Sequence, residues 1–234
     1  MRKFDYSFLK RISVPADIMN YATSIYEMKA KVELRRSDFA EVFSAMESVA
    51  KIQSVKSSNA IERIITTDKR IRDIVNKFTA PQGHNELEIA GYRDALDLIH
   101  SSYSDIPFSE KSILELHRML LQPSGDDLAG KYKTEDNFII ETDREGVRSV
   151  RFTTVPASET AFAMEQLILA YHAAYSEAEI NPLMLITCVI LDLLCIHPFR
   201  NVNGRMSRLL SLLLMYKSGF NAGKYVSIEE QINT

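Results

Sequence analysis

The sequence predicts an all-α protein that carries one small β element. Apolar residues recur at helical spacing in successive segments along most of the chain, which indicates a series of amphipathic helices. Only 8 Gly and 7 Pro occur among the 234 residues, so the helices meet few residues that would break them. Two neighbouring β-prone runs, 137–141 and 147–152, depart from this pattern. One hairpin cannot build a sheet domain, so we expect a flap on a helical body.

The expected helices follow one another with short loops between them. The first has an apolar stripe of Ile18, Tyr21, Ile25, Met28 and Val32. Polar residues and prolines mark the starts of the helices. Gly219 suits the left-handed position that follows the last long helix. The expected helices cover about residues 16–35, 38–55, 68–79, 86–103, 109–121, 158–176, 182–196 and 205–218, and Ser227 caps another that the sequence cuts off at Thr234.

Composition restricts the setting and the partners. Apolar content of 46% and charged content of 25% are ordinary for a soluble globular protein, and no repeat or linker divides the chain. A net charge of −3 predicts no nucleic-acid partner. The apolar run 183–196 contains Asp192 and falls short of the roughly 20 residues that a membrane span needs, so we expect no membrane association. Cys188 and Cys195 lie about 10 Å apart on one expected helix, too far for a disulfide, which favours a cytoplasmic protein.

The densest cluster of polar chemistry lies in the loop between the last two long helices. His197 has a pKa near neutrality and is a natural general base. Asn203 and Gly204 precede the next helix, where free N–H groups and the helix dipole favour an anion. Arg205 and Arg208 share one face of its first turn and can reach one phosphate chain. The set suits attack of a deprotonated nucleophile on a nucleotide phosphate. A connector loop with solvated arginines and a capping His is an equally open interpretation.

A second polar feature interrupts the helical pattern in residues 54–67. Ser58 and Glu62 are four residues apart, so on a helix their side chains lie on one face. On spacing alone, a solvated Ser and Glu beside packed isoleucines is the simpler interpretation. The sequence contains no P-loop, dinucleotide fingerprint, zinc motif or nucleophile elbow, which excludes those chemistries.

Residues 197–208, HPFRNVNGRMSR, resemble the Fic-family motif H-P-F-x-[D/E]-G-N-G-R-x-x-R. Residues 130–133, the hairpin and Pro156 are similar to the family's flap region, and residues 88–95 to a family helix. Residues 58–62 resemble the S/T-x-x-x-E-[G/N] motif of the class with an N-terminal inhibitory helix. The resemblance implies a Fic-type helical bundle with a central helix–loop–helix. The expected organisation is an N-terminal arm and helix (1–37) and a Fic-type domain (38–234), with the inhibitory helix at about 38–67, the flap at about 137–154 and the active-site loop at 197–208.

The resemblance implies a protein adenylyltransferase (AMPylator), which transfers AMP from ATP to a protein Ser, Thr or Tyr hydroxyl. His197 would deprotonate that hydroxyl, whose oxygen would attack the α-phosphorus and expel pyrophosphate. Asn203 and the amides around Gly204 would hold phosphate oxygens, Arg205 would bind the β/γ end and Arg208 the γ-phosphate. The hairpin would hold the target protein by strand addition. A second copy of this chain is a candidate target, and a homodimer is a candidate assembly.

The same resemblance implies autoinhibition. Glu62, in one motif with Ser58, would form an ion pair with Arg208. The pair would take away a phosphate partner and hold ATP in an unproductive pose.

Three positions depart from the family pattern. Asn201 stands where an acidic residue normally ligates Mg²⁺, and a neutral amide oxygen coordinates more weakly than a carboxylate. Val202 stands where Gly is usual, so a positive φ there would be costly. Arg63 follows the inhibitory Glu where Gly or Asn is usual. We expect the first two to weaken activity.

Those departures keep other functions open. One is a degenerate, non-catalytic nucleotide-binding regulatory module. Another is a different nucleotide transfer, such as UMP transfer, or de-AMPylation on the same scaffold. The sequence also stops where relatives typically carry a further helix, which suggests a truncated chain.

Overall fold

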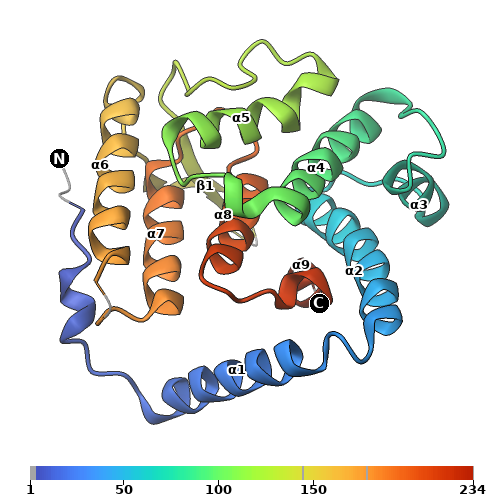
Figure 1. Cartoon of the computed structure of the whole chain (residues 1–234). Helices are drawn as coiled ribbons and strands as arrows, with labels where there is room; N and C mark the ends of the chain where they lie inside the picture. Colours follow the sequence, from blue (N-terminus) through green and yellow to red (C-terminus); the bar gives the residue numbers. More distant parts are fainter. Residues whose placement is uncertain (1–3, 144, 178, 234) are drawn as a thin grey trace.

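The computed structural model describes residues 4–143, 145–177 and 179–233. Within these residues the regular structure is helical apart from one antiparallel hairpin, as predicted (Figure 1). No helix among them combines the length and apolar content that a membrane span requires. The elements are α1 (Ala16–Arg35), α2 (Ala40–Ile61), α3 (Asp68–Val75), α4 (Gly83–Ser102), α5 (Glu110–Leu121), β1 (Phe138–Thr142), β2 (Arg148–Thr153), α6 (Ala157–Tyr175), α7 (Pro182–Ile196), α8 (Asn203–Lys217) and α9 (Ile228–Ile232), with short 3₁₀ turns at Ser7–Lys10, Tyr103–Asp105, Gln122–Ser124 and Ala222–Lys224.

The core forms around α7 and α8, which pack against each other and against α4, α5 and α6 (Figure 1). The predicted start of α7 is confirmed, because Pro182 is its first residue and the Asn181 side chain accepts from the Leu183 N–H at 3.0 Å. Gly219, with φ +80°, has the predicted left-handed conformation after α8. These signals fix the two ends of the helix–loop–helix that the site uses.

Helix α2 is longer than predicted. The sequence indicated a break near Val55, but the helix continues through Ser58 and Asn59, both completely buried. Hydrogen bonds satisfy these polar side chains inside the protein; the Asn59 Nδ2, for example, donates to the Val55 carbonyl at 2.7 Å. Arg63 then ends the segment with φ +61°, a left-handed conformation uncommon for a residue with a side chain. The helix therefore continues past the predicted break, because its buried polar side chains have hydrogen-bond partners.

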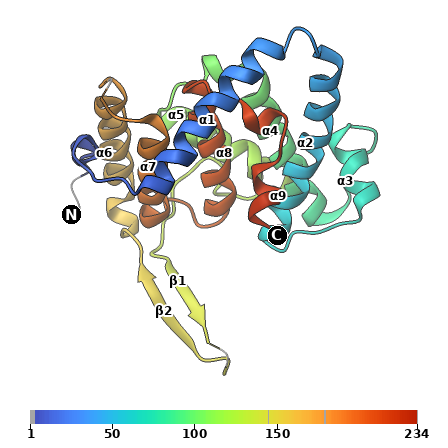
Figure 2. The same cartoon turned by 90° about the horizontal axis from the view of Figure 1, so that it is seen from below.

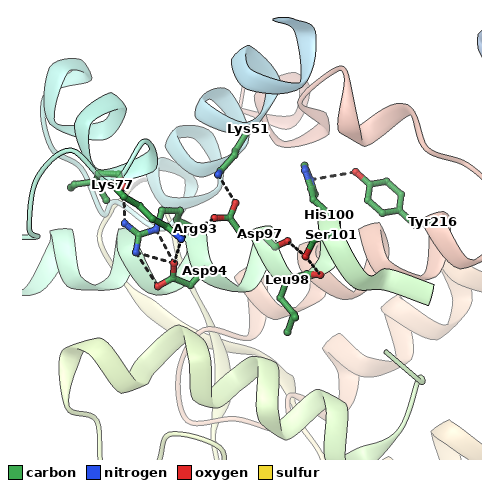
Figure 3. Close-up of polar contacts among 10 residues, drawn as sticks. Lys51, Lys77, Arg93, Asp94, Asp97, Leu98, His100, Ser101 and Tyr216 are labelled. Carbon is green, nitrogen blue, oxygen red and sulfur yellow. Dashed lines mark hydrogen bonds and ion pairs between the residues drawn. The ribbon is translucent and has the colours of Figure 1, made fainter. Parts of the chain in front are cut away.

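Ion pairs hold α2 and α3 against α4. Figure 3 shows Lys51 of α2 directed at Asp97 of α4, with an ion pair between them. Lys77, just beyond α3, lies 3.6 Å from the same carboxylate, and Asp94 accepts from Arg93 at 2.9 Å. Asp97 of α4 thus binds both a lysine of α2 and one that follows α3.

The predicted apolar stripe of α1 does not join the core. None of its 20 residues is buried, and Tyr21 and Met28 are 66% and 56% exposed. Figure 1 shows α1 along one edge of the molecule, where Tyr26 meets the ring of Phe220 at 5.2 Å. Helical spacing identifies an amphipathic helix, but it does not say what covers the apolar face.

Three predicted boundaries were also wrong. Helix α3 ends at Val75, before the predicted 79; α4 starts at Gly83, before the predicted 86; and α8 starts at Asn203, before the predicted 205. At α8 the helix begins directly after the left-handed residue Val202, and the side chain of Asn203 bonds back to Phe199 in the preceding loop.

The hairpin of β1 and β2 projects from the helical body (Figure 2). Its antiparallel register pairs Thr142 with Arg148 and shifts between Ile139 and Ile140. Asp143 starts the turn, and its Oδ1 accepts from the backbone N–H of Glu145 and of Val147, at 2.9 Å each. Arg144, in the same predicted turn, lies outside the described residues. The prediction of one flap on a helical body is confirmed.

Candidate active site

The loop that joins α7 to α8 turns sharply at His197. This residue has a left-handed backbone, φ 52° and ψ 61°, and its N–H donates to the Leu193 carbonyl at 2.9 Å. Pro198 follows and cannot continue the helix. Phe199 is then completely buried, with its ring stacked on that of His117 from α5 at a centroid distance of 3.8 Å. The loop is therefore anchored in the core directly after its candidate base.

The ring of His197 has an assignable tautomer. Its Nδ1 lies 3.3 Å from the carbonyl oxygen of Leu194, which can only accept, so Nδ1 carries the proton and Nε2 is left as the acceptor. Burial lowers the pKa of His197, and the ammonium of Lys133 lowers it further, while the Leu194 carbonyl and the carboxylate of Glu62 act in the opposite direction. The net shift favours the neutral ring that a general base needs.

Asn203 shapes the loop with its side chain. Its Oδ1 accepts from the Phe199 N–H at 3.0 Å, and its Nδ2 donates to the Phe199 carbonyl at 2.7 Å. The residue is 5% exposed. Because both ends of the amide bond to Phe199, the side chain closes the loop rather than pointing at a ligand.

Val202 takes the positive φ that the sequence marked as costly there. It has φ 61° and ψ 15° directly before α8, and its side chain packs against the core. A β-branched residue in this region is an outlier, with a cost of about 1–3 kcal/mol. The loop thus keeps a left-handed turn at this position without a glycine.

Glu62 places its carboxylate over the first turn of α8. A Cβ at Gly204 would lie 2.3 Å from the Glu62 Oε1, so a residue with a side chain there would displace this carboxylate. Free N–H groups and the helix dipole favour an anion at such a helix start. The predicted anion position is therefore next to a carboxylate of the chain itself.

Arg208 contacts the end of α2 through three hydrogen bonds. Its Nη2 donates to the Glu62 Oε1 at 2.9 Å and to the Ser58 carbonyl at 2.9 Å, and its Nε donates to the Ser58 Oγ at 2.8 Å. The Arg208 side chain is 14% exposed. The predicted ion pair between Glu62 and Arg208 is present, and Ser58 is its second anchor.

Arg205 is buried and joins neighbouring helices; it is not an exposed cation. It is 3% exposed, forms an ion pair with Glu88 of α4, and donates to the Asn59 Oδ1 of α2 at 3.3 Å. Its buried Nε has no hydrogen-bond partner. The first motif arginine therefore ties α8 to two neighbouring helices, whereas Arg208 reaches the candidate anion position.

The helix–loop–helix and the flap occupy the segment that a known family shares. Residues 107–215 match the sequence model of the Fic/DOC family. The chain carries a Fic domain. That segment extends from the residue before Phe108 to Met215 near the end of α8, so it includes the hairpin and the whole His197 loop.

Two curated relatives match the Fic domain and its surroundings. Protein adenylyltransferase fic-1 of Caenorhabditis elegans is 32% identical over 142 residues, which are 58% of this chain and 25% of that protein. Protein adenylyltransferase Fic of Nematostella vectensis is 27% identical over 178 residues, 73% of this chain and 39% of that protein. The chain thus spans a quarter to two fifths of the length of these relatives.

The fold extends beyond the matched segment. A crystal structure of a Fic family protein from Desulfovibrio desulfuricans G20 aligns with a TM-score of 0.77 at 18% identity. The alignment covers 95% of this chain and 64% of that chain. At that identity the likeness shows the fold, which here includes helices on both sides of the Fic domain.

The predicted magnesium position has few donor atoms around it. Asn201, the predicted weak ligand of Mg²⁺, is exposed and lines a pocket of about 340 Å³ together with Glu62, Asp126 and Arg205. The carboxylate of Asp126 accepts from Arg200 at 2.9 Å. Among the described residues, no three or more His, Cys, Asp or Glu gather where they could hold a metal ion. These donors do not fit a protein-built magnesium site, and we assign no step to a metal.

Sequence reasoning missed several residues that build the Fic domain's site. Glu88 and Asn59 bind Arg205, and His117 supports the ring of Phe199. Each comes from another helix, so no local spacing could pair it with the loop. A charged or amide residue within an apolar helix face is the one available signal, and it does not name the partner.

Proposed function

We propose that this chain is a protein adenylyltransferase that uses ATP, and that Glu62 restrains it. The observation that carries the proposal is that three features needed for the reaction occur together in one site. The Nε2 of His197 is free to accept a proton, the start of α8 is an anion position, and Glu62 and Ser58 hold Arg208 beside it. The names of the two curated relatives support AMP transfer as the chemistry.

The proposed reaction needs one proton acceptor and a site for phosphate oxygens. The target hydroxyl gives its proton to the His197 Nε2, its oxygen bonds to the α-phosphorus of ATP, and the bond to the departing pyrophosphate breaks. Backbone N–H groups at Gly204 bind phosphate oxygens, and Arg208 binds the γ-phosphate once Glu62 releases it. Arg205 contributes its charge from the pocket wall, and Asn203 maintains the loop.

The hairpin is the proposed docking element for the target protein. Its strands pair only with each other among the described residues, so their outer edges can accept a strand of another protein. A second copy of this chain is one candidate target. Mg²⁺ stays a prediction, with ligands that the nucleotide phosphates would mostly supply.

The test combines one activating and one inactivating substitution. Glu62→Gly should free Arg208 and raise the incorporation of AMP from ATP, into the chain or an added protein, at least tenfold over wild type. Adding His197→Ala should abolish that gain while ATP binding persists. Mass spectrometry for the AMP adduct and calorimetry with ATP measure the two properties. ATP binding by Glu62→Gly without any adduct would refute the transfer proposal.

A second candidate function is a nucleotide-binding regulatory module without transfer activity. The neutral Asn201 and the strained backbone of Val202 favour it. In that case Asn201→Asp, made in the Glu62→Gly background, should create activity that the parent lacks. Equal activity in the two variants would exclude this candidate.

A further inference from the structure

The two stems of the hairpin meet at one buried lysine. Lys133, shortly before β1, is 4% exposed. Its ammonium donates to the Asn137 Oδ1 at 2.7 Å, to the Thr154 Oγ1 at 2.9 Å and to the Ile196 carbonyl at 3.2 Å. Asn137 precedes β1, Thr154 follows β2, and Ile196 is the last residue of α7. One cation therefore joins both ends of the flap to the residue before His197.

Further bonds join the same stem to the carbonyls of the catalytic loop. The Lys133 backbone N–H donates to the Pro198 carbonyl at 2.9 Å, and the Asn137 Nδ2 donates to the Phe199 carbonyl at 3.0 Å. The same Asn137 Nδ2 also lies 3.5 Å from the His197 carbonyl, so with Ile196 all four consecutive carbonyls around His197 accept from this stem. The positions of the flap and of the candidate base are thus set by the same contacts.

The ammonium of Lys133 has an unusual set of partners. All three acceptors are neutral, and within the described ranges its ammonium forms no ion pair. Burial lowers the pKa of Lys133 to about 8, against the opposing effect of Asp136. A buried charge without a carboxylate partner is unfavourable for folding alone. Its position beside the His197 loop suggests what it does.

Two charged groups that act on His197 come from different elements. Lys133 acts from the base of the hairpin, and Glu62 acts from the end of α2. The Leu194 carbonyl, on the same helix, binds Nδ1. A cation next to an imidazole opposes its protonation, so Lys133 favours the neutral ring while Glu62 favours the charged one.

We propose that Lys133 is a positioning residue for the transfer step, which ties the flap to the catalytic loop and keeps His197 in its neutral, proton-accepting form. The effect of Lys133 on the transfer rate rests on the proposed function. Its effect on the titration of His197 does not, so an experiment can refute the proposed function without refuting this effect, and the reverse.

The test is the titration of the His197 ring by NMR, with its signals assigned by their loss in His197→Ala. Lys133→Met, which keeps the stem and removes the charge, should raise the pKa of His197 by about half a unit or more. Lys133→Arg should leave it near the wild-type value. Lys131→Met is the matched control, because it removes an exposed charge two residues away. An unchanged His197 titration in folded Lys133→Met would overturn the proposal.

A measurement on the wild-type chain covers the case in which Lys133→Met does not fold. The His197 signals should show a second inflection near pH 8, where Lys133 loses its proton. Absence of that inflection would overturn the proposal as well. In an active Glu62→Gly background, Lys133→Met should also move the acid limb of the pH–rate profile to higher pH. If Lys133→Met lowered the rate equally at every pH without that movement, Lys133 would have only a structural role, which would contradict the proposal.

Discussion

At the scale of single residues, the loop depends on side chains that bond to its own backbone. Asn203 satisfies the N–H and the carbonyl of Phe199, and Phe199 in turn fills the core against His117. The motif suggested a phosphate ligand for Asn203, because residue type and position say nothing of which atoms are already used. Gly204 was placed at the anion position for its backbone, and the approach of Glu62 is a second reason for its missing side chain.

Asn203→Ala should destabilise the protein by about 1–3 kcal/mol, because the buried N–H of Phe199 loses its partner and the Phe199 carbonyl keeps only the Asn137 amide. Asn201→Ala is the matched control, since the same amide is removed from an exposed position of the same loop, and it should change stability by less than about 0.5 kcal/mol. Urea unfolding of both variants measures the difference. Equal stabilities would show that the amide does not hold the loop.

At the scale of elements, the end of α2 is held by a second buried group besides Arg208. Glu229 of α9 is 4% exposed, and its carboxylate accepts from Ser54 of α2 at 2.8 Å, from Tyr92 of α4 at 3.1 Å and from Ser227 at 3.2 Å. Ser54 lies one helical turn before Ser58. The short last helix thus holds the segment that carries Ser58 and Glu62, the residues proposed to restrain activity.

Glu229→Gln should loosen that segment. Its single remaining side-chain oxygen and added N–H donors cannot satisfy three hydroxyl donors, so we expect a loss of about 1–3 kcal/mol and faster amide exchange in the second half of α2. Glu230→Gln, which changes the neighbouring and less buried carboxylate, is the control. Hydrogen exchange followed by mass spectrometry reports the effect, and unchanged exchange in Glu229→Gln would contradict it.

At the scale of the whole molecule, the buried His117 and the partly buried His100 connect stability to pH. Burial lowers the pKa of His100 and of His117 from 6.5 to about 4 each. Between pH 6.5 and 4 the unfolded chain binds protons at these histidines that the folded chain does not. Their contribution to the free energy of unfolding is therefore fully present above pH 6.5 and is lost as the pH falls toward 4.

The unfolding free energy should therefore fall with decreasing pH by up to about 2.7 kcal/mol per unit below pH 6. Urea unfolding at pH 7, 6 and 5 measures this slope. His100→Gln removes one of the two groups and should roughly halve it. A slope that does not respond to this substitution would contradict the assignment.

The sequence predicted the architecture of the molecule better than its contacts. Helical spacing, Asn181 before Pro182 and the turn at Asp143 are local signals, and local hydrogen bonds realise them. The Fic-type motif singled out His197 at the end of α7 and Arg208 in α8, and the ion pair of Arg208 with Glu62 that the resemblance implied is present. The surroundings of Arg205 and Lys133 could not be predicted, because their partners lie in other segments of the chain.

The left-handed backbone of Val202 also affects how often the loop leaves its present shape. Strain of about 1–3 kcal/mol is held only in the conformation described, and any rearrangement that returns φ to negative values releases it. Relative to an unstrained residue, such alternative loop shapes are favoured about fivefold to more than a hundredfold. The strain at Val202 therefore lowers the free energy that a rearrangement of this loop costs, compared with a glycine at the same position.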